Sequence, residues 1–107
     1  MADIAAVLDV TIEVDPAQED DFNEWYDTRH IPERLAMPGF VAAHRFASTE
    51  RPGRYLAIYE LDDPQAALSD AYMAAARALE TEWDVRVHAS WTSMHREVWR
   101  AVGRGAG

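Results

Sequence analysis

The first segment of the chain alternates apolar residues with mostly polar ones, and this period of two predicts a β-strand over residues 4–14. One face of the strand carries Ile4, Ala6, Leu8, Val10, Ile12 and Val14. The other face carries Val7, Asp9, Thr11 and Glu13. A strand with one apolar face has to cover that face with a second layer, so we expect helices to pack on it.

A helix start follows this strand directly. Asp15 suits the N-cap, Pro16 suits the first helical position, and Gln18 lies three residues after the cap. The helix is expected to contain Phe22, Trp25, Tyr26 and Arg29. We expect it to end before Pro32, because proline interrupts helical hydrogen bonding.

Two further strands follow the loop at Pro38-Gly39. Residues 40–48 alternate as a second strand, and residues 54–61 read as a third. Between them, residues 50–53 have the sequence Glu-Arg-Pro-Gly, which is typical of a turn. The pair is therefore predicted to form a hairpin.

The second half of the chain repeats the pattern of strand end and helix start. Asp63-Pro64 opens a second helix, which is rich in alanine and is expected to end near residues 80–83. It carries Leu68, Tyr72, Met73 and Leu79. A last strand is predicted between residues 94 and 102, and residues 103–107 are expected to form a disordered tail.

The predicted order of elements is βαββαβ, in one domain that covers residues 1–107. Two right-handed split βαβ units give a four-stranded antiparallel sheet, in strand order 4-1-3-2, with both helices on one face. This is the ferredoxin-like α+β fold. The length of 107 residues fits one hydrophobic core.

The sheet face opposite the helices is also predicted to be partly apolar. Under the helices we place Leu8, Val10, Ile12, Leu56 and Ile58. On the open face we place Val7, Thr11, Phe40, Phe46, Tyr55 and Tyr59. An exposed apolar patch of this size indicates a partner surface, and we expect two copies to pack sheet to sheet as a C2 homodimer.

The charge and the apolar runs exclude several classes of partner. The net charge of −9 argues against nucleic acid and anionic membranes, which both require clustered cations. No apolar run reaches the roughly 20 residues of a membrane-spanning helix, and the N-terminus lacks the features of a secretion signal. We therefore expect a soluble, cytoplasmic protein.

The residue types that are missing limit the chemistry. The chain has no cysteine, and all ten of its basic Lys or Arg residues are arginine. Thiol nucleophiles, thiolate zinc sites and Schiff-base chemistry are thereby excluded. The four histidines lack the spacing of a metal motif, and no phosphate-binding loop or serine nucleophile elbow is present, so no metal is predicted.

The segment from Trp25 to His30 is the strongest candidate site. It places two aromatic rings, the Arg29 cation and the His30 imidazole near the end of one helix. An imidazole in such surroundings can titrate near neutrality and transfer a proton, so His30 is predicted as the catalytic acid or base. The alternative is a surface or capping histidine that bonds a loop carbonyl.

Other residues are predicted to complete a pocket around His30. His88 is a candidate second acid or base, and His95 is a weaker one. Residues predicted to bind substrate are Trp25, Tyr26, Arg29, His44, Tyr59 and Trp91. Apolar pockets with a few polar anchors are typical of small-molecule sites. Each residue has an alternative role. The aromatic residues and His44 could instead pack in the core or at an interface, and Arg29 could form a solvated ion pair.

The segment Trp25-Tyr26 to His30, followed by Pro38-Gly39-Phe40 and Arg45, resembles the dimeric α/β-barrel superfamily, nearest its EthD-like branch. The resemblance covers nearly the whole chain and implies a ferredoxin-like dimer. That superfamily includes cofactor-free antibiotic-biosynthesis monooxygenases, muconolactone isomerases and haem proteins that resemble chlorite dismutase. The resemblance carries over His30 alone, and the chain is short for a haem-binding member, so no cofactor is expected.

These features lead to one main functional hypothesis and two others. The main one is a cofactor-independent enzyme in which His30 transfers a proton on a small apolar carbonyl, phenol or lactone, as an isomerase, a lyase or a monooxygenase. The second is a non-enzymatic dimeric protein that binds an apolar or aromatic metabolite or assists a neighbouring oxidase. The third is an interaction module with a filled interior.

Overall fold

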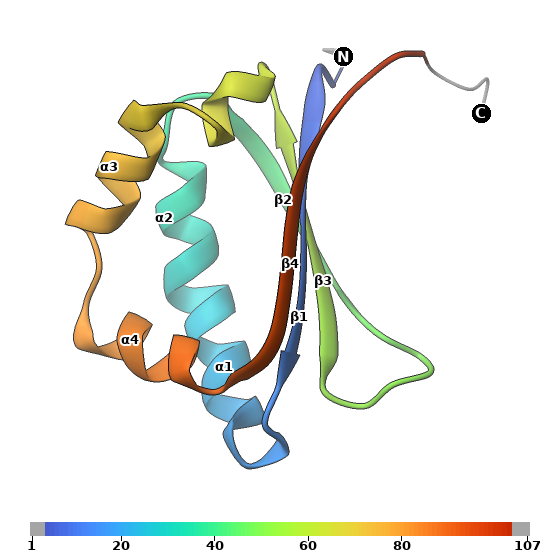
Figure 1. Ribbon diagram of the computed structural model, residues 1–107, viewed down its shortest axis with the longest axis vertical. Coiled ribbons are helices and arrows are strands. Elements are labelled where there is room, and N and C mark those ends of the chain that lie inside the picture. The colour runs from blue at the N-terminus through green and yellow to red at the C-terminus, as the bar shows by residue number, and fades with distance from the viewer. Residues whose placement is uncertain (1–3, 104–107) are drawn as a thin grey trace.

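The computed structural model describes residues 4–103, which form one antiparallel sheet with the helices on one of its faces (Figure 1). The strands are β1 (Ala6–Val14), β2 (Phe40–Ala47), β3 (Arg54–Leu61) and β4 (Trp91–Arg100). Their order in the sheet is β2-β3-β1-β4. The βαββαβ fold class and the strand order 4-1-3-2 are therefore confirmed. Apart from Gly103, the tail predicted to be disordered lies outside the described residues.

The helical segment that connects β1 to β2, called the first helical layer below, is longer than predicted. It begins with the 3-10 turn η1 (Pro16–Gln18), where the Asp15 carboxylate accepts a hydrogen bond of 3.0 Å from the Ala17 N–H. It continues through α1 (Glu19–Trp25), the π-helix η2 (Tyr26–His30) and α2 (Ile31–Leu35).

The predicted end before Pro32 is wrong, and the π-helix explains why. The Ile31 N–H donates to the carbonyl of Tyr26, five residues earlier, so the hydrogen-bond register changes just before Pro32. Pro32 then lies in the first turn of α2, where a missing N–H costs little.

The helical segment that connects β3 to β4, called the second helical layer below, consists of three short helices. They are η3 (Pro64–Ala67), α3 (Asp70–Ala78) and α4 (Glu82–Ala89). Each has its own side-chain N-cap, from Asp63, Ser69 and Thr81 in turn. Helix α4 was not predicted, and β4 begins at Trp91, three residues before the predicted start.

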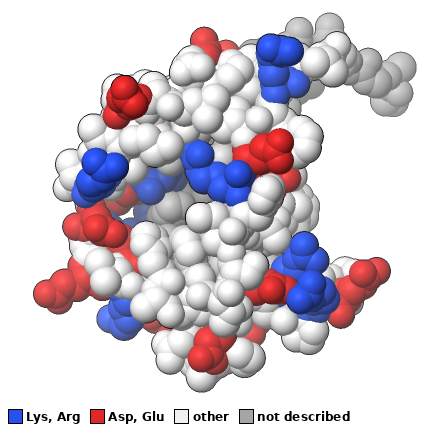
Figure 2. Space-filling model, viewed as in Figure 1, with Lys and Arg blue, Asp and Glu red and all other residues white. Residues whose placement is uncertain are grey.

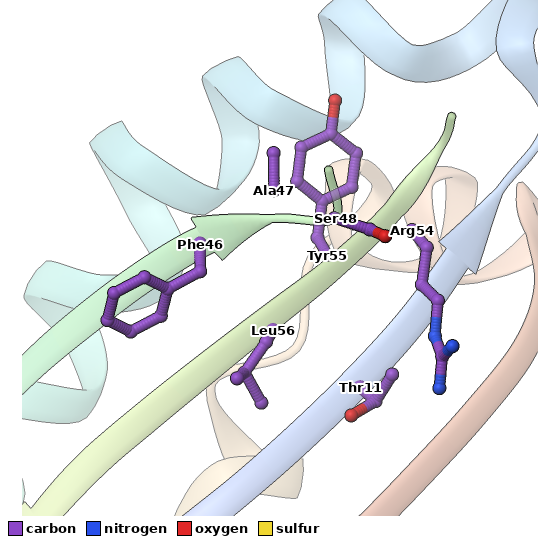
Figure 3. Close-up of a pocket in the computed structure, with 7 residues that line it drawn as sticks. All are labelled: Thr11, Phe46, Ala47, Ser48, Arg54, Tyr55 and Leu56. Carbon is purple, nitrogen blue, oxygen red and sulfur yellow. The ribbon is translucent and has the colours of Figure 1, made fainter. Parts of the chain in front are cut away.

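The predicted faces of β3 are wrong. Leu8, Val10 and Ile12 lie opposite Tyr59, Ala57 and Tyr55. Directly opposite residues of an antiparallel pair share a face, so these β3 residues pack under the helices and Leu56 and Ile58 lie on the open face. Figure 3 shows Tyr55 directed toward the helices and Leu56 directed away from them.

Phe40 is also on the helix side and not on the open face. Its ring stacks on Tyr72 of α3 with 5.4 Å between centroids, and a bulge between Phe40 and Ala42 separates it from the alternation of β2. Phe46 lies on the open face as predicted, and Trp99, which was not predicted there, joins it; they are 52% and 50% exposed. An apolar open face is thus present, with a composition different from the predicted one.

Gly39 allows β2 to start close to the second helical layer. Its φ is +87°, and a Cβ atom at this position would lie 2.5 Å from the Cβ of Ala66 in η3. Both the backbone conformation and the lack of space therefore require glycine. Among residues 4–103, none of the helices has the length and the apolar character needed to cross a membrane.

Candidate functional site

A cavity of ≈ 360 Å³ lies between the two helical layers and opens to the surface. Its lining comes from α1, η2, α2, α3, α4 and the segment before α4: Trp25, His30, Glu33, Arg34, Ala76, Arg77, Glu80, Asp84 and His88. Figure 2 shows a hollow on this side of the molecule with basic and acidic side chains around it. Three predicted site residues, Trp25, His30 and His88, meet in this cavity.

His30 is the last residue of the π-helix, and its half-buried ring rests on aromatic neighbours. It stacks on Trp25 with 4.5 Å between ring centroids and meets the Tyr26 ring at an angle at 4.8 Å. Within residues 4–103, neither ring nitrogen forms a hydrogen bond, so both are available to a bound molecule.

Burial, and then the positive charge of Arg34, lower the pKa of His30 to about 3. The imidazole is therefore neutral at physiological pH. In that form one nitrogen donates a hydrogen bond and the other accepts one.

Asp84 holds the ring on which His30 stacks. This carboxylate is 7% exposed and accepts hydrogen bonds from the Trp25 indole N–H at 2.7 Å and from Nε of Arg29 at 2.9 Å. It also accepts from the backbone N–H of Thr81 at 2.6 Å, which forms a capping box at the start of α4. Burial tends to raise the pKa of Asp84, but the hydrogen bonds from Arg29, Trp25 and Thr81 outweigh burial and lower it.

Arg29 was predicted to bind substrate, and it does not line the cavity. Its guanidinium is bound by Asp84, by Glu33 at 3.2 Å and by the carbonyl oxygen of Leu79 at 2.8 Å. These contacts tie the first helical layer to the start of α4.

A second acid lies in the reverse arrangement. Asp21 of α1 accepts from the Trp83 indole N–H at 3.1 Å and from Nη2 of Arg86 at 3.0 Å, both residues of α4. Each of the two helices therefore supplies one carboxylate to a tryptophan of the other. The Asp21 pair is much more exposed, with 60% of the Arg86 side chain accessible to solvent.

Tyr26 and Tyr59 lie behind His30 in the core and not in the cavity. Their hydroxyl groups are joined by a hydrogen bond of 3.0 Å, and burial raises the pKa of both. The region beside Tyr26 that is bounded by Val10, Phe22 and Arg45 has no space for a water molecule. The interior between the sheet and the first helical layer is filled there.

His88 lines the cavity from α4, and Trp91 packs beside it. Their rings lie 4.5 Å apart, and His88 also meets Trp25 at 5.7 Å. Burial lowers the pKa of His88. The indole N–H of Trp91 is buried and has no hydrogen-bond partner in the described part of the chain, but Trp91 does not line the cavity.

The other two histidines lie on the opposite face of the sheet. His44 pairs with Ile58 across the strands, and its Nε2 contacts Glu60 at 2.5 Å. His95 lies opposite Thr11 on β4, with Nε2 3.5 Å from Glu97. The structure therefore does not bring His44 or His95 to the cavity.

Five charged residues of the cavity were missed by sequence reasoning: Glu33, Arg34, Arg77, Glu80 and Asp84. Arg34 could have been found, since it lies four residues after His30 and thus near it on a helix. Asp84 could have been found from its spacing to Thr81, which is that of a capping box. Arg77 and Glu80 gave no signal, because their position depends on the break between α3 and α4.

A second hollow, of ≈ 240 Å³, lies at the end of the β2–β3 hairpin (Figure 3). It is lined by Thr11, Phe46, Ala47, Ser48, Arg54, Tyr55 and Leu56. None of these is a histidine or a carboxylate. Among residues 4–103, no group of three or more His, Cys, Asp or Glu side chains is arranged to hold a metal ion.

Comparison with known families identifies one match over most of the chain. The family described as "Domain of unknown function (DUF4286)" matches residues 5–97. The chain belongs to this family. A comparison with curated proteins gave no match.

Solved structures with the same fold cover nearly the whole chain. A monooxygenase from the gene ActVA-Orf6 of Streptomyces coelicolor, in complex with Nanaomycin D, is 18% identical with a TM-score of 0.72 and covers 97% of this chain and 93% of its own. SnoaB, a cofactor-independent oxygenase from Streptomyces nogalater, is 17% identical with a TM-score of 0.62 and covers 94% of this chain and 96% of its own.

A dimeric ferredoxin-like protein from an uncultured marine organism is 9% identical, with a TM-score of 0.72. It covers 98% of this chain and 94% of its own. At these identities the similarity establishes the fold.

The buried contacts of Asp84 predict a large loss of stability when its carboxylate is removed. We expect Asp84→Ala to lower the free energy of unfolding by about 3 kcal/mol, because Arg29 and the Trp25 N–H lose their buried partner. The matched control is Asp21→Ala, which removes a more exposed pair and is expected to cost less than about 1 kcal/mol. Urea unfolding of both variants measures the difference, and equal losses would contradict the assigned role of Asp84.

The low pKa of His30 predicts a specific pH dependence. Between pH 6.5, the ordinary pKa of histidine, and about pH 3, the unfolded chain binds a proton that the folded chain does not. Lowering the pH should therefore destabilise the wild type relative to His30→Asn, by at most about 1.4 kcal/mol per pH unit. Urea unfolding at pH 7, 6 and 5 measures this. An NMR titration of the His30 ring with a midpoint near 6.5 would refute it.

Proposed function

We propose that this chain is a cofactor-independent enzyme that removes a proton from a small phenol, carbonyl or lactone bound in the ≈ 360 Å³ cavity. His30 is the proposed acid–base residue. The observation that carries the proposal is the neutral His30 imidazole, which borders the cavity on an aromatic support and has no hydrogen-bond partner within residues 4–103. Arg34, one helical turn later, is the proposed stabiliser of the substrate anion.

The energetics of this proton transfer require two positive charges near the substrate anion: the imidazolium of His30 that forms and the guanidinium of Arg34. A phenol with a pKa of about 10 lies roughly seven units above His30, so transfer costs on the order of 10 kcal/mol in the absence of other effects. A unit charge pair at about 4 Å contributes roughly 4 kcal/mol at an effective dielectric constant of 20. The anion gains one such attraction from the imidazolium that forms and a second from Arg34. Together they offset most of the cost.

Oxygenation is the variant that the structural neighbours favour. They include a cofactor-independent oxygenase and a monooxygenase bound to Nanaomycin D. In this variant the substrate is an activated phenol whose keto tautomer has a ring CH2 group. After deprotonation, the carbanion reduces O2; one oxygen atom becomes the new carbonyl oxygen, and the other leaves as water. The CH2 group supplies all the electrons, so no further reductant is needed. Isomerase or lyase chemistry would use the same first step.

A second function, ligand binding without turnover, is favoured by one observation. An imidazole whose pKa is about 3 in the empty cavity is a weak base. If a bound ligand brings no acidic proton, the same cavity would simply hold an apolar or aromatic metabolite. Binding of many related compounds without conversion of any of them would support this alternative.

We also propose that the chain is a homodimer that packs through its open sheet face. The support is the exposure of Phe46 and Trp99 on that face and the dimeric state of one structural neighbour. The assignment to the EthD-like branch, the single domain over residues 1–107 and the cytoplasmic location stay predictions.

Replacement of His30 tests the catalytic role. With a substrate that the wild type converts, His30→Asn should reduce the rate by roughly 10²- to 10⁴-fold, because proton transfer loses its acceptor. The control is Glu24→Gln, which removes an exposed acid–base side chain on α1 that does not line the cavity and should leave the rate unchanged. Oxygen uptake and product formation are measured together, and an unaltered rate in His30→Asn would eliminate the role.

A charge on the open sheet face should prevent dimerisation. Light scattering should give about twice 12.1 kDa for the wild type and about 12.1 kDa for Phe46→Glu, because the glutamate would be buried without a partner. Val85→Glu is the matched control, since Val85 is 56% exposed on α4, away from this face. A wild type that remains monomeric at micromolar concentration would contradict the proposed dimer.

A further inference from the structure

Most charged groups in the wall of the cavity are already paired. Asp84 is bound to Arg29, and Glu33 contacts Nη1 of Arg34 at 2.7 Å and Nη2 of Arg29 at 3.2 Å. These contacts cancel two negative charges against two positive ones. The ligand therefore meets only the groups that remain outside the pairs.

Arg77 is the cation that remains. It lies on α3 at the wall of the cavity, and its guanidinium forms no ion pair or hydrogen bond with any residue between 4 and 103. Arg77 is an exposed residue, so its guanidinium is free to turn toward a ligand. Ala76, its neighbour in the lining, has a small side chain that leaves the space beside it open. An arginine fork in such a position suits a carboxylate.

The aromatic floor specifies the rest of the ligand. Trp25 and His30 both line the cavity, and their rings are stacked with 25° between their planes. A flat ring can lie against them while its hydroxyl group reaches a nitrogen of His30. Arg34 lies on the same side, where only its Nη1 is used by Glu33.

Resting on the proposed function, we propose that the ligand of this cavity is a flat aromatic acid, a hydroxylated ring that carries a carboxylate, and that Arg77 selects it by binding the carboxylate. The hydroxyl group faces His30 and the carboxylate faces α3. No role in moving the proton is assigned to Arg77; it is a specificity-determining residue.

Glu80 determines where the carboxylate can lie. It also lines the cavity, and its neighbour within 4.0 Å is Nδ1 of His88 at 3.9 Å, a ring whose lowered pKa favours the neutral form. A ligand carboxylate is repelled by Glu80 and attracted by Arg77, so it must lie on the Arg77 side of the cavity, next to α3. Removal of the Glu80 charge should therefore strengthen the binding of the acid.

Two probes with the same ring system test the inference: 2-naphthol and 6-hydroxy-2-naphthoate. By calorimetry, the wild type should bind the carboxylate probe about 5- to 20-fold more tightly, the range expected for a partly solvated charge-assisted contact. Arg77→Gln should abolish this preference without changing the affinity for 2-naphthol. The matched control, Arg100→Gln, removes the same charge from an exposed site on β4 and should keep the preference. Glu80→Gln should increase it.

Each outcome decides the inference. It is overturned if the wild type binds both probes equally, if it binds neither, or if Arg77→Gln keeps the preference. A cavity-filling variant, Ala76→Phe, should lose both probes, whereas Ala74→Phe on the exposed side of α3 should bind both; equal binding by the two variants would place the ligand elsewhere and also overturn it.

Failure of the ligand class can be told from failure of the enzyme hypothesis. Turnover of neutral phenols that depends on His30 but not on Arg77 would refute the proposed carboxylate ligand and support the proposed enzyme. An Arg77-dependent preference for the carboxylate probe, with no conversion of any hydroxylated aromatic acid in the presence of O2, would support the ligand class and refute the enzyme hypothesis.

Discussion

The buried carboxylate of Asp84 is the interaction on which the candidate site depends. It joins the start of α4 to two residues of the first helical layer, Trp25 and Arg29, that lie far from it in the chain. Because the Trp25 indole is held by this acid, the plane on which His30 stacks has a defined position. The Asp21 contacts to Trp83 and Arg86 add a second, more exposed connection between the same helices.

The π-helix determines which residues reach the cavity. A single turn of this kind changes the hydrogen-bond register and re-aims the side chains that follow, and such turns are frequent at functional sites. Here it covers Tyr26 to His30 and lets the helix pass Pro32. As a result His30, Glu33 and Arg34 form part of one wall, facing α3 and α4.

The fold could be predicted because its signals are local, whereas the site depends on contacts between distant segments. The alternation of the strands, the turn at residues 50–53 and the caps at Asp15 and Asp63 are enough to predict the order of elements. The faces of strand β3 were predicted wrongly, because residues 55–59 are apolar on both sides of the strand. Only the pairing with β1 determines which side packs under the helices. His30 was found from its aromatic neighbours, but Arg77 reaches the cavity only through the break before α4.

The positive φ of Gly39 has a consequence for the whole second helical layer. The space where a side chain would stand is occupied by Ala66, so the strand and the helical turn touch through backbone and methyl groups alone. This close approach also brings Tyr72 into contact with Phe40. The absence of one carbon atom at Gly39 thereby sets how closely η3, and the helix α3 that follows it, approach the start of β2.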